Sequence, residues 1–106
     1  MQYGLSRATI EQINGVFARF PSIKKAVLYG SRAKGHYKTG SDIDLTLMGE
    51  KLNLKMLGDV GDELDDLMLP YSIDLSLFDK LSNEDLREHI TRVGMVFYER
   101  ADTAEK

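Results

Sequence analysis

Two aspartates separated by a single residue could do chemistry together. Asp42 and Asp44 lie in a segment that alternates polar and apolar residues, so their carboxylates would leave the same face of a strand, with Cα atoms about 6.6 Å apart. Two like charges this close destabilise each other unless a cation compensates them, and the strand itself offers no Lys or Arg. Hard oxygen ligands of this kind suit Mg²⁺, which completes its shell with water and substrate phosphates.

A third aspartate, Asp74, has the same phase in a second alternating segment, 71–78. If the two strands are neighbours, about 4.8 Å apart, their polar faces combine into a cluster of three carboxylates. Such a cluster suits two metal ions that assist phosphoryl or nucleotidyl displacement. Taken alone, Asp74 fits a turn or capping residue slightly better, whereas the common phase of all three aspartates favours the site.

The pair Gly30 and Ser31 follows directly after the apolar run 25–29. A glycine allows close backbone approach, and a serine adds a hydroxyl beside exposed backbone N–H groups, which suits a bound phosphate. The loop that follows supplies three basic side chains for charge compensation: Arg32, Lys34 and Lys38. An ordinary turn and a solvated basic loop are the alternatives to this interpretation.

The elements that must position these residues alternate between helix and strand. Apolar residues recur at helical spacing after Ser6, which is typical of an N-cap, and again over 54–68. A third helix is expected between Ser82, as its N-cap, and Gly94. Short apolar runs or strict alternation predict four strands: 25–29, 41–48, 71–78 and 95–98. The order α-β-β-α-β-α-β predicts an α+β fold, a small sheet with helices packed on it.

Length and charge narrow the functional class. A chain of 106 residues fits one domain, here residues 1–98, followed by a polar tail, 99–106. Without cysteine, a disulfide framework and a cysteine-based zinc site are excluded. No apolar run reaches the length of a membrane span, so a cytoplasmic protein without membrane contact is expected. The net charge of -3 argues against direct contact with nucleic acid, while five basic residues and no acid between 21 and 41 suit a small anionic ligand.

The spacing of these motifs resembles a known signature. Residues 29–31 (YGS), ten intervening residues, then 42–45 (DIDL) and later 73–75 (IDL) are similar to the pattern of the DNA polymerase β-like nucleotidyltransferase superfamily. With GSRAKG followed by SDIDL in so short a chain, the sequence most resembles the minimal nucleotidyltransferase (MNT) proteins. The resemblance implies a mixed-sheet, palm-like core that binds a nucleoside triphosphate together with magnesium.

Carried over by position, the resemblance implies a role for each residue of the motif. Gly30 and Ser31 would hold the triphosphate, and the basic loop adds Arg32 as a third nucleotide-binding residue that compensates its charge. Three carboxylates would ligate two Mg²⁺ ions and carry catalysis: Asp42, Asp44 and Asp74. Of these, Asp74 would stand nearest the attacking hydroxyl, as a metal ligand or as the general base. The sequence keeps this third acid, which degenerate relatives lose.

The resemblance also implies a partner protein. Members of the family are commonly paired with a HEPN-domain toxin, which some of them neutralise by transferring AMP from ATP to a toxin tyrosine. The expected activity is therefore that of a protein adenylyltransferase acting as an antitoxin, in a homo- or hetero-oligomer. Two alternatives stay open: a binding module that blocks its partner by occupancy without catalysis, and a small-molecule nucleotidyltransferase of the antibiotic-modifying kind. The absence of a second domain argues against the latter.

Overall fold

A four-stranded mixed sheet forms the centre of the chain in a computed structural model, which describes residues 2–38 and 40–101. The strands are β1 (Lys25–Tyr29), β2 (Ile43–Met48), β3 (Ile73–Leu77) and β4 (Met95–Glu99), in the spatial order β3-β2-β1-β4. β1 runs antiparallel to β2 and to β4, whereas β2 and β3 are parallel. The predicted small mixed sheet is confirmed. The two strands in which polar and apolar residues alternate, β2 and β3, are neighbours.

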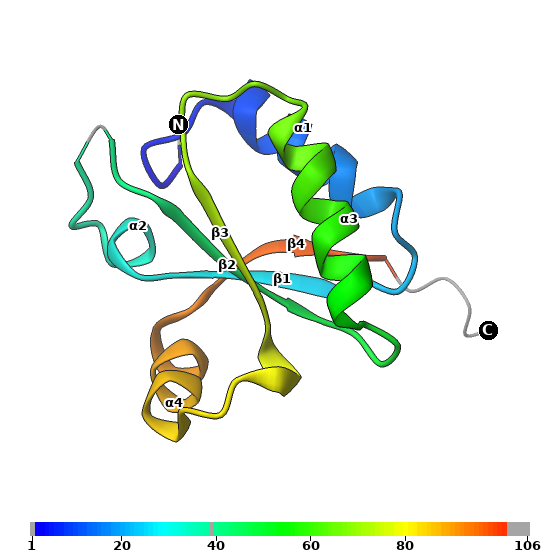
Figure 1. The fold of residues 1–106 in the computed structure, drawn as a ribbon. Helices are drawn as coiled ribbons and strands as arrows, with labels where there is room; N and C mark the ends of the chain where they lie inside the picture. Colours follow the sequence, from blue (N-terminus) through cyan, green and yellow to red (C-terminus); the bar gives the residue numbers. More distant parts are fainter. Residues whose placement is uncertain (1, 39, 102–106) are drawn as a thin grey trace.

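Two helices, α1 (Arg7–Ala18) and α3 (Leu54–Asp65), lie side by side and cover one face of the sheet (Figure 1). Their apolar residues pack against the strand residues that alternate toward this face. In β2 these are Ile43, Leu45 and Leu47, each at most 1% exposed. The alternation predicted for this strand is therefore confirmed, and it leaves the polar residues of β2 on the opposite face.

That opposite face receives α4 (Glu84–Val93), which contacts β1. Val27 of β1 points away from the main core and lies against the end of α4, because a Cβ added at Gly94 would come within 2.5 Å of Val27 Cγ1. Val27 and Ile90 are both buried, yet neither belongs to the main core cluster. The fold therefore has a large core on one face and a smaller apolar contact beside polar residues on the other.

One predicted helix cap is confirmed and another is wrong. The Ser6 side chain accepts a hydrogen bond of 3.1 Å from the backbone N–H of Thr9, as expected of the N-cap of α1. At α4, however, the cap is Asn83 and not Ser82: the Asn83 side chain accepts the N–H of Leu86 at 3.1 Å. Both residue types can cap a helix, and Asn83 is the one that immediately precedes the first turn.

Two short helical segments were not predicted. The first, α2 (Ser31–Lys34), lies at the end of β1 in Figure 1, where a basic loop was expected. The second is a 3₁₀ turn, η1 (Phe78–Lys80), directly after β3. The helix expected over 54–68 ends earlier, at Asp65.

The end of the described chain is bound to the rest of the domain. β4 extends through Glu99, one residue beyond the predicted strand. The Arg100 guanidinium donates to the carbonyls of Ala18 (3.1 Å), Phe20 (3.2 Å) and Ile23 (3.2 Å). The remainder of the predicted polar tail, 102–106, lies outside the described residues. In the described ranges, no helix has the length and apolar character needed to cross a membrane.

Candidate active site

On the polar face of the sheet, the predicted site residues Asp44 and Asp74 lie in one row with Tyr29. Tyr29 of β1 pairs with Asp44 of β2 in the antiparallel ladder, and Asp44 pairs with Asp74 of β3 in the parallel ladder. Adjacent strands lie about 4.8 Å apart, so the side chains of paired residues are direct neighbours on one face. Asp42 immediately precedes β2 and is exposed. The structure thus brings β3, which carries Asp74, beside β2, which carries Asp44 and directly follows Asp42.

Among the residues that the structure describes, the negative charge of this row has no basic partner in an ion pair. Burial raises the pKa of the Asp44 carboxyl, and the neighbouring charges of Asp74 and then Asp42 raise it further. Within residues 2–38 and 40–101, no Lys or Arg forms an ion pair with any of the three carboxylates. Uncompensated carboxylate oxygens on one face are a donor set that fits a hard divalent cation such as Mg²⁺.

The carboxylates alone do not enclose a metal ion. Among the residues that the structure describes, no three His, Asp or Glu side chains form a group that could hold one. Mg²⁺ usually takes one or two protein carboxylates and completes its octahedral shell with water and phosphate oxygens. The donor set therefore fits a cation shared with a bound nucleotide, and the assignment of Asp42, Asp44 and Asp74 as ligands stays a prediction.

Gly30 joins the row of carboxylates to α2. Its backbone angles, φ 80° and ψ -155°, belong to a region that is essentially reserved for glycine. A Cβ at this position would lie 2.5 Å from Asp44 Oδ2, so a side chain here would displace the carboxylate. Gly30, the first of the predicted phosphate-binding pair, therefore lies directly beside the central aspartate. Ser31 follows it as the first residue of α2.

Arg32 lies in an environment that the sequence did not indicate. Its side chain is only 2% exposed, although it was predicted in a basic, nucleotide-binding loop. The guanidinium donates through Nε (3.1 Å) and Nη2 (2.8 Å) to the carbonyl of Ser41, and through Nη1 (2.8 Å) to the carbonyl of Tyr3. It also stacks on the rings of Tyr71 and Tyr37, at 5.0 and 5.4 Å from their centroids. These contacts bind Arg32 to the protein itself.

A small polar network, which the sequence did not reveal, lies on the same face of the sheet as the carboxylates. The Ser76 hydroxyl donates to Thr46 Oγ1 at 2.8 Å, and Thr46 is fully buried. Burial raises the pKa of the Tyr29 hydroxyl, as do the charges of Asp74 and Asp44, while a hydrogen bond with Ser76 opposes the shift. The shared phase of these residues with the aspartates was the signal that could have identified them.

The remaining predicted basic residues lie outside this row. Lys34, at the end of α2, and Lys38 are both exposed. The backbone N–H of Lys38 donates to Ser41 Oγ at 2.8 Å, which closes the loop before Asp42. Their predicted role in compensating the charge of a bound anion stays a prediction.

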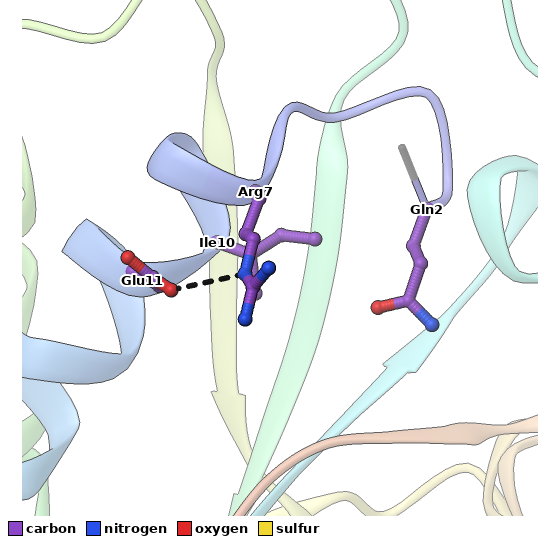
Figure 2. A pocket seen from close by; sticks show the side chains of 4 residues that line it. All are labelled: Gln2, Arg7, Ile10 and Glu11. Carbon is purple, nitrogen blue, oxygen red and sulfur yellow. Dashed lines mark ion pairs between the residues drawn. The ribbon is translucent and has the colours of Figure 1, made fainter.

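A separate surface pocket of about 420 Å³ lies at the beginning of α1. Figure 2 shows Gln2 across its opening from Arg7 and Glu11, which form an ion pair (3.3 Å), with Ile10 beside them. Its described lining includes none of the predicted site residues. We therefore assign the candidate site to the polar face of the sheet and not to this pocket.

Comparison with known proteins identifies a family. The family model described as "Polymerase beta, Nucleotidyltransferase" matches residues 11–103. A curated relative, "Probable protein adenylyltransferase MntA" of Haemophilus influenzae, is 35% identical over 79 residues, which are 74% of this chain and 68% of that protein. The family match spans all the motif residues on which the resemblance depends, 29–31, 42–45 and 73–75.

Solved structures share the fold. A toxin–antitoxin crystal structure with AMP-PNP superposes with a TM-score of 0.68 at 18% identity, covering 91% of this chain and 75% of that one. The complex of a tri-AMPylated Shewanella oneidensis HEPN toxin with an MNT antitoxin gives 0.66 at 14% identity, covering 91% and 74%. At such identities the likeness shows the fold alone. With most of its length matched by the family model and a relative above 30% identity, the chain belongs to the polymerase β-like nucleotidyltransferase family.

Proposed function

We propose that this chain transfers AMP from ATP to a hydroxyl group of a HEPN-domain partner protein and so acts as its antitoxin. The observation that carries the proposal is the direct pairing of Asp44 with Asp74 beside Gly30. The relative named as a protein adenylyltransferase supports the reaction, and the structural neighbours with AMP-PNP and an AMPylated HEPN toxin support the nucleotide and the partner. A cytoplasmic location, where ATP is available, is part of this proposal.

The proposed reaction is an in-line displacement at the α-phosphorus of ATP. The acceptor oxygen forms a bond to this phosphorus, the bond to the leaving pyrophosphate breaks, and the hydroxyl proton passes to a base. Gly30 and Ser31 would hold the triphosphate, and Asp42 and Asp44 would hold Mg²⁺. When bound, Mg²⁺ supplies neutralisation of the charge that develops on the phosphate oxygens.

Asp74 has the position expected of the residue that meets the acceptor. It lies on β3, an edge strand of the sheet, so an acceptor can approach it without displacing another strand. As the base it would take the hydroxyl proton, and as a ligand it would share the cation with its neighbour Asp44.

The openness of the site supports a macromolecular acceptor. Asp42 and Asp74 are exposed, so the chain by itself does not exclude water from the reacting groups. Exclusion of water strengthens the electrostatic interactions that stabilise a developing charge. A partner protein that covers the polar face while presenting its hydroxyl would complete the site.

The test combines the purified chain, Mg²⁺, ATP labelled at the α-phosphate and a HEPN-domain protein as the acceptor. We expect labelled partner with the wild type and none with Asp42→Asn or Asp44→Asn. The matched control is Asp59→Asn on α3, which removes an exposed carboxylate paired with Lys55 (3.1 Å) and should leave labelling unchanged. Undiminished labelling by both site variants would contradict the metal-site assignment.

The same system separates the alternatives. If an Asp42/Asp44/Asp74 triple alanine variant that is folded still neutralises the partner, the chain acts by occupancy and not by transfer. If ATP turnover appears with small hydroxylated acceptors in the absence of the partner, the acceptor is a small molecule.

A further inference from the structure

We infer that Arg32 is a positioning residue, which holds the phosphate-binding turn and the carboxylates in register without touching the nucleotide. The inference rests on the proposed transfer reaction and replaces the phosphate contact that the sequence predicted for this residue. Its basis is that the chain segments carrying Ser31, Asp42 and Asp74 all meet at one buried guanidinium.

The first link joins α2 to the residue before Asp42. Arg32 follows Ser31 on α2, and its Nε and Nη2 both bind the carbonyl of Ser41, at 3.1 and 2.8 Å. This carbonyl belongs to the peptide group that leads into Asp42. Fixing that peptide therefore fixes the backbone of Asp42 relative to Ser31.

The second link reaches β3 and the N-terminal segment. The guanidinium lies 5.0 Å from the ring centroid of Tyr71, which precedes the strand of Asp74 by two residues. Its Nη1 donates to the carbonyl of Tyr3 at 2.8 Å, and a Cβ on Gly4 would come within 2.9 Å of the same nitrogen. Gly4 has a φ of 74°, a backbone conformation that favours glycine, and its lack of a side chain leaves room for the guanidinium.

These segments need an external support. α2 has only four residues, and a helix this short is not stable by itself because nucleation is unfavourable. Asp42 lies before the first residue of β2 and so outside the named strand. A single side chain that binds both segments is thus the direct means by which the structure holds them.

Lysine cannot replace arginine in this role. The planar guanidinium donates in a fixed fork to one carbonyl while its faces stack on aromatic rings, whereas an ammonium group is a compact charge without either property. A phosphate contact, by contrast, depends chiefly on the charge and would be partly kept by lysine. Arg32→Lys therefore distinguishes positioning from direct binding of the nucleotide.

The first readout is hydrogen exchange of the free protein, which requires no activity. The reporting amides are those of Ile43, which donates to the carbonyl of Ser72 (2.9 Å), and of His36, which donates to that of Ser31 (2.9 Å). In Arg32→Lys we expect both to exchange about tenfold faster or more, the factor for losing a charge-assisted hydrogen bond. Tyr71→Phe, which keeps the stacking ring, should leave them unchanged, and Tyr71→Leu should accelerate them.

The matched control is Arg100→Lys. Arg100 is also a partly buried guanidinium bound to backbone carbonyls, but those of Ala18, Phe20 and Ile23, at the opposite end of β1 from Gly30. This variant should lower thermal stability without changing exchange at Ile43. If Arg32 only stabilises the fold, Arg32→Lys and Arg100→Lys should each lose AMP transfer only to the extent that the protein is unfolded.

The second readout is AMP transfer at a temperature where all variants are folded. Positioning predicts that Arg32→Lys lowers kcat at least tenfold and raises the Mg²⁺ concentration for half-maximal rate, with little change in KM for ATP. Unchanged hydrogen exchange at Ile43 would overturn the positioning role alone. So would a raised KM for ATP in Arg32→Lys together with a higher activity of Arg32→Lys than of Arg32→Ala. A wild-type chain that transfers nothing to its partner would overturn the proposed function itself.

Discussion

Asp44 and Asp74 are paired residue against residue across the parallel ladder of β2 and β3. Their carboxylates share one face of the sheet and have no basic partner among the described residues. Folding buries the Asp44 carboxyl in part and brings like charges beside it, and both effects raise its pKa. A site of this kind is held together by the fold at some electrostatic cost, which a cation and a nucleotide would relieve.

The first prediction concerns the metal-free protein. A raised pKa means that the ionised Asp44 disfavours the folded state, so this cost is absent below the ordinary Asp range and complete above the raised pKa. Asp44→Asn should therefore increase the free energy of unfolding near pH 7, by less than about 1 kcal/mol because the group is half-exposed. Near pH 3 the variant and the wild type should coincide. Urea denaturation with a chelator at both pH values measures this, and a loss of stability near pH 7 would contradict it.

The second prediction is that Mg²⁺ with ATP stabilises the wild type. A ligand that binds only the folded state adds about 2.7 kcal/mol at 100 times its dissociation constant. Thermal unfolding with Mg²⁺ and ATP, compared with a chelator, should show this increase. Asp44→Asn should lose most of it, while Asp59→Asn should keep it. Equal stabilisation of all three proteins would place the ligand elsewhere.

The third prediction concerns Gly30. Gly30→Ala should lower the free energy of unfolding by about 1–3 kcal/mol, because its backbone angles are essentially confined to glycine. It should also abolish transfer in the fraction that remains folded, since the added Cβ would displace Asp44 Oδ2. Gly15→Ala on the exposed side of α1 is the control and should stabilise the protein slightly, as nothing lies within 4 Å of its Cβ. Full activity of a folded Gly30→Ala protein would argue against this geometry.

The fourth prediction tests the corrected helix cap. Asn83→Ala should destabilise the protein by about 1 kcal/mol, since it removes the acceptor for the Leu86 N–H. Ser82→Ala should change the stability little. Chemical denaturation of the two variants gives the comparison, and the reverse order would restore Ser82 as the cap.

The sequence predicted correctly those features that depend on residues close together along the chain, such as the bounds of a strand and the face on which a side chain lies. The apolar run predicted β1 with its observed bounds, and alternation placed Asp44 and Asp74 in the correct phase on β2 and β3. Which strands are neighbours, and in which register, depends on contacts between distant segments. The alternation of polar and apolar residues therefore could not predict that β2 and β3 are neighbours, and the three-carboxylate cluster was predicted only on the assumption that they are.

Arg32 shows why the rest could not be predicted. In the sequence it is one of several basic residues in a glycine-containing loop, a pattern typical of an exposed anion-binding segment. Its environment is decided by Tyr3 and Tyr71, which are remote in the sequence and become its neighbours only when the sheet forms. Composition indicates that such a charge is present but not that it is buried.

The bond from Arg32 to the carbonyl of Tyr3 has a practical consequence for recombinant work. A fusion partner or affinity tag attached ahead of Gln2 would lie next to the segment whose Tyr3 carbonyl accepts from Arg32, the side chain that also binds the carbonyl of Ser41. Preparations tagged at that end should show weaker transfer than preparations tagged after residue 101, where the last described contacts are with Ala18, Phe20 and Ile23. The position of the tag is therefore a variable that an activity assay should control.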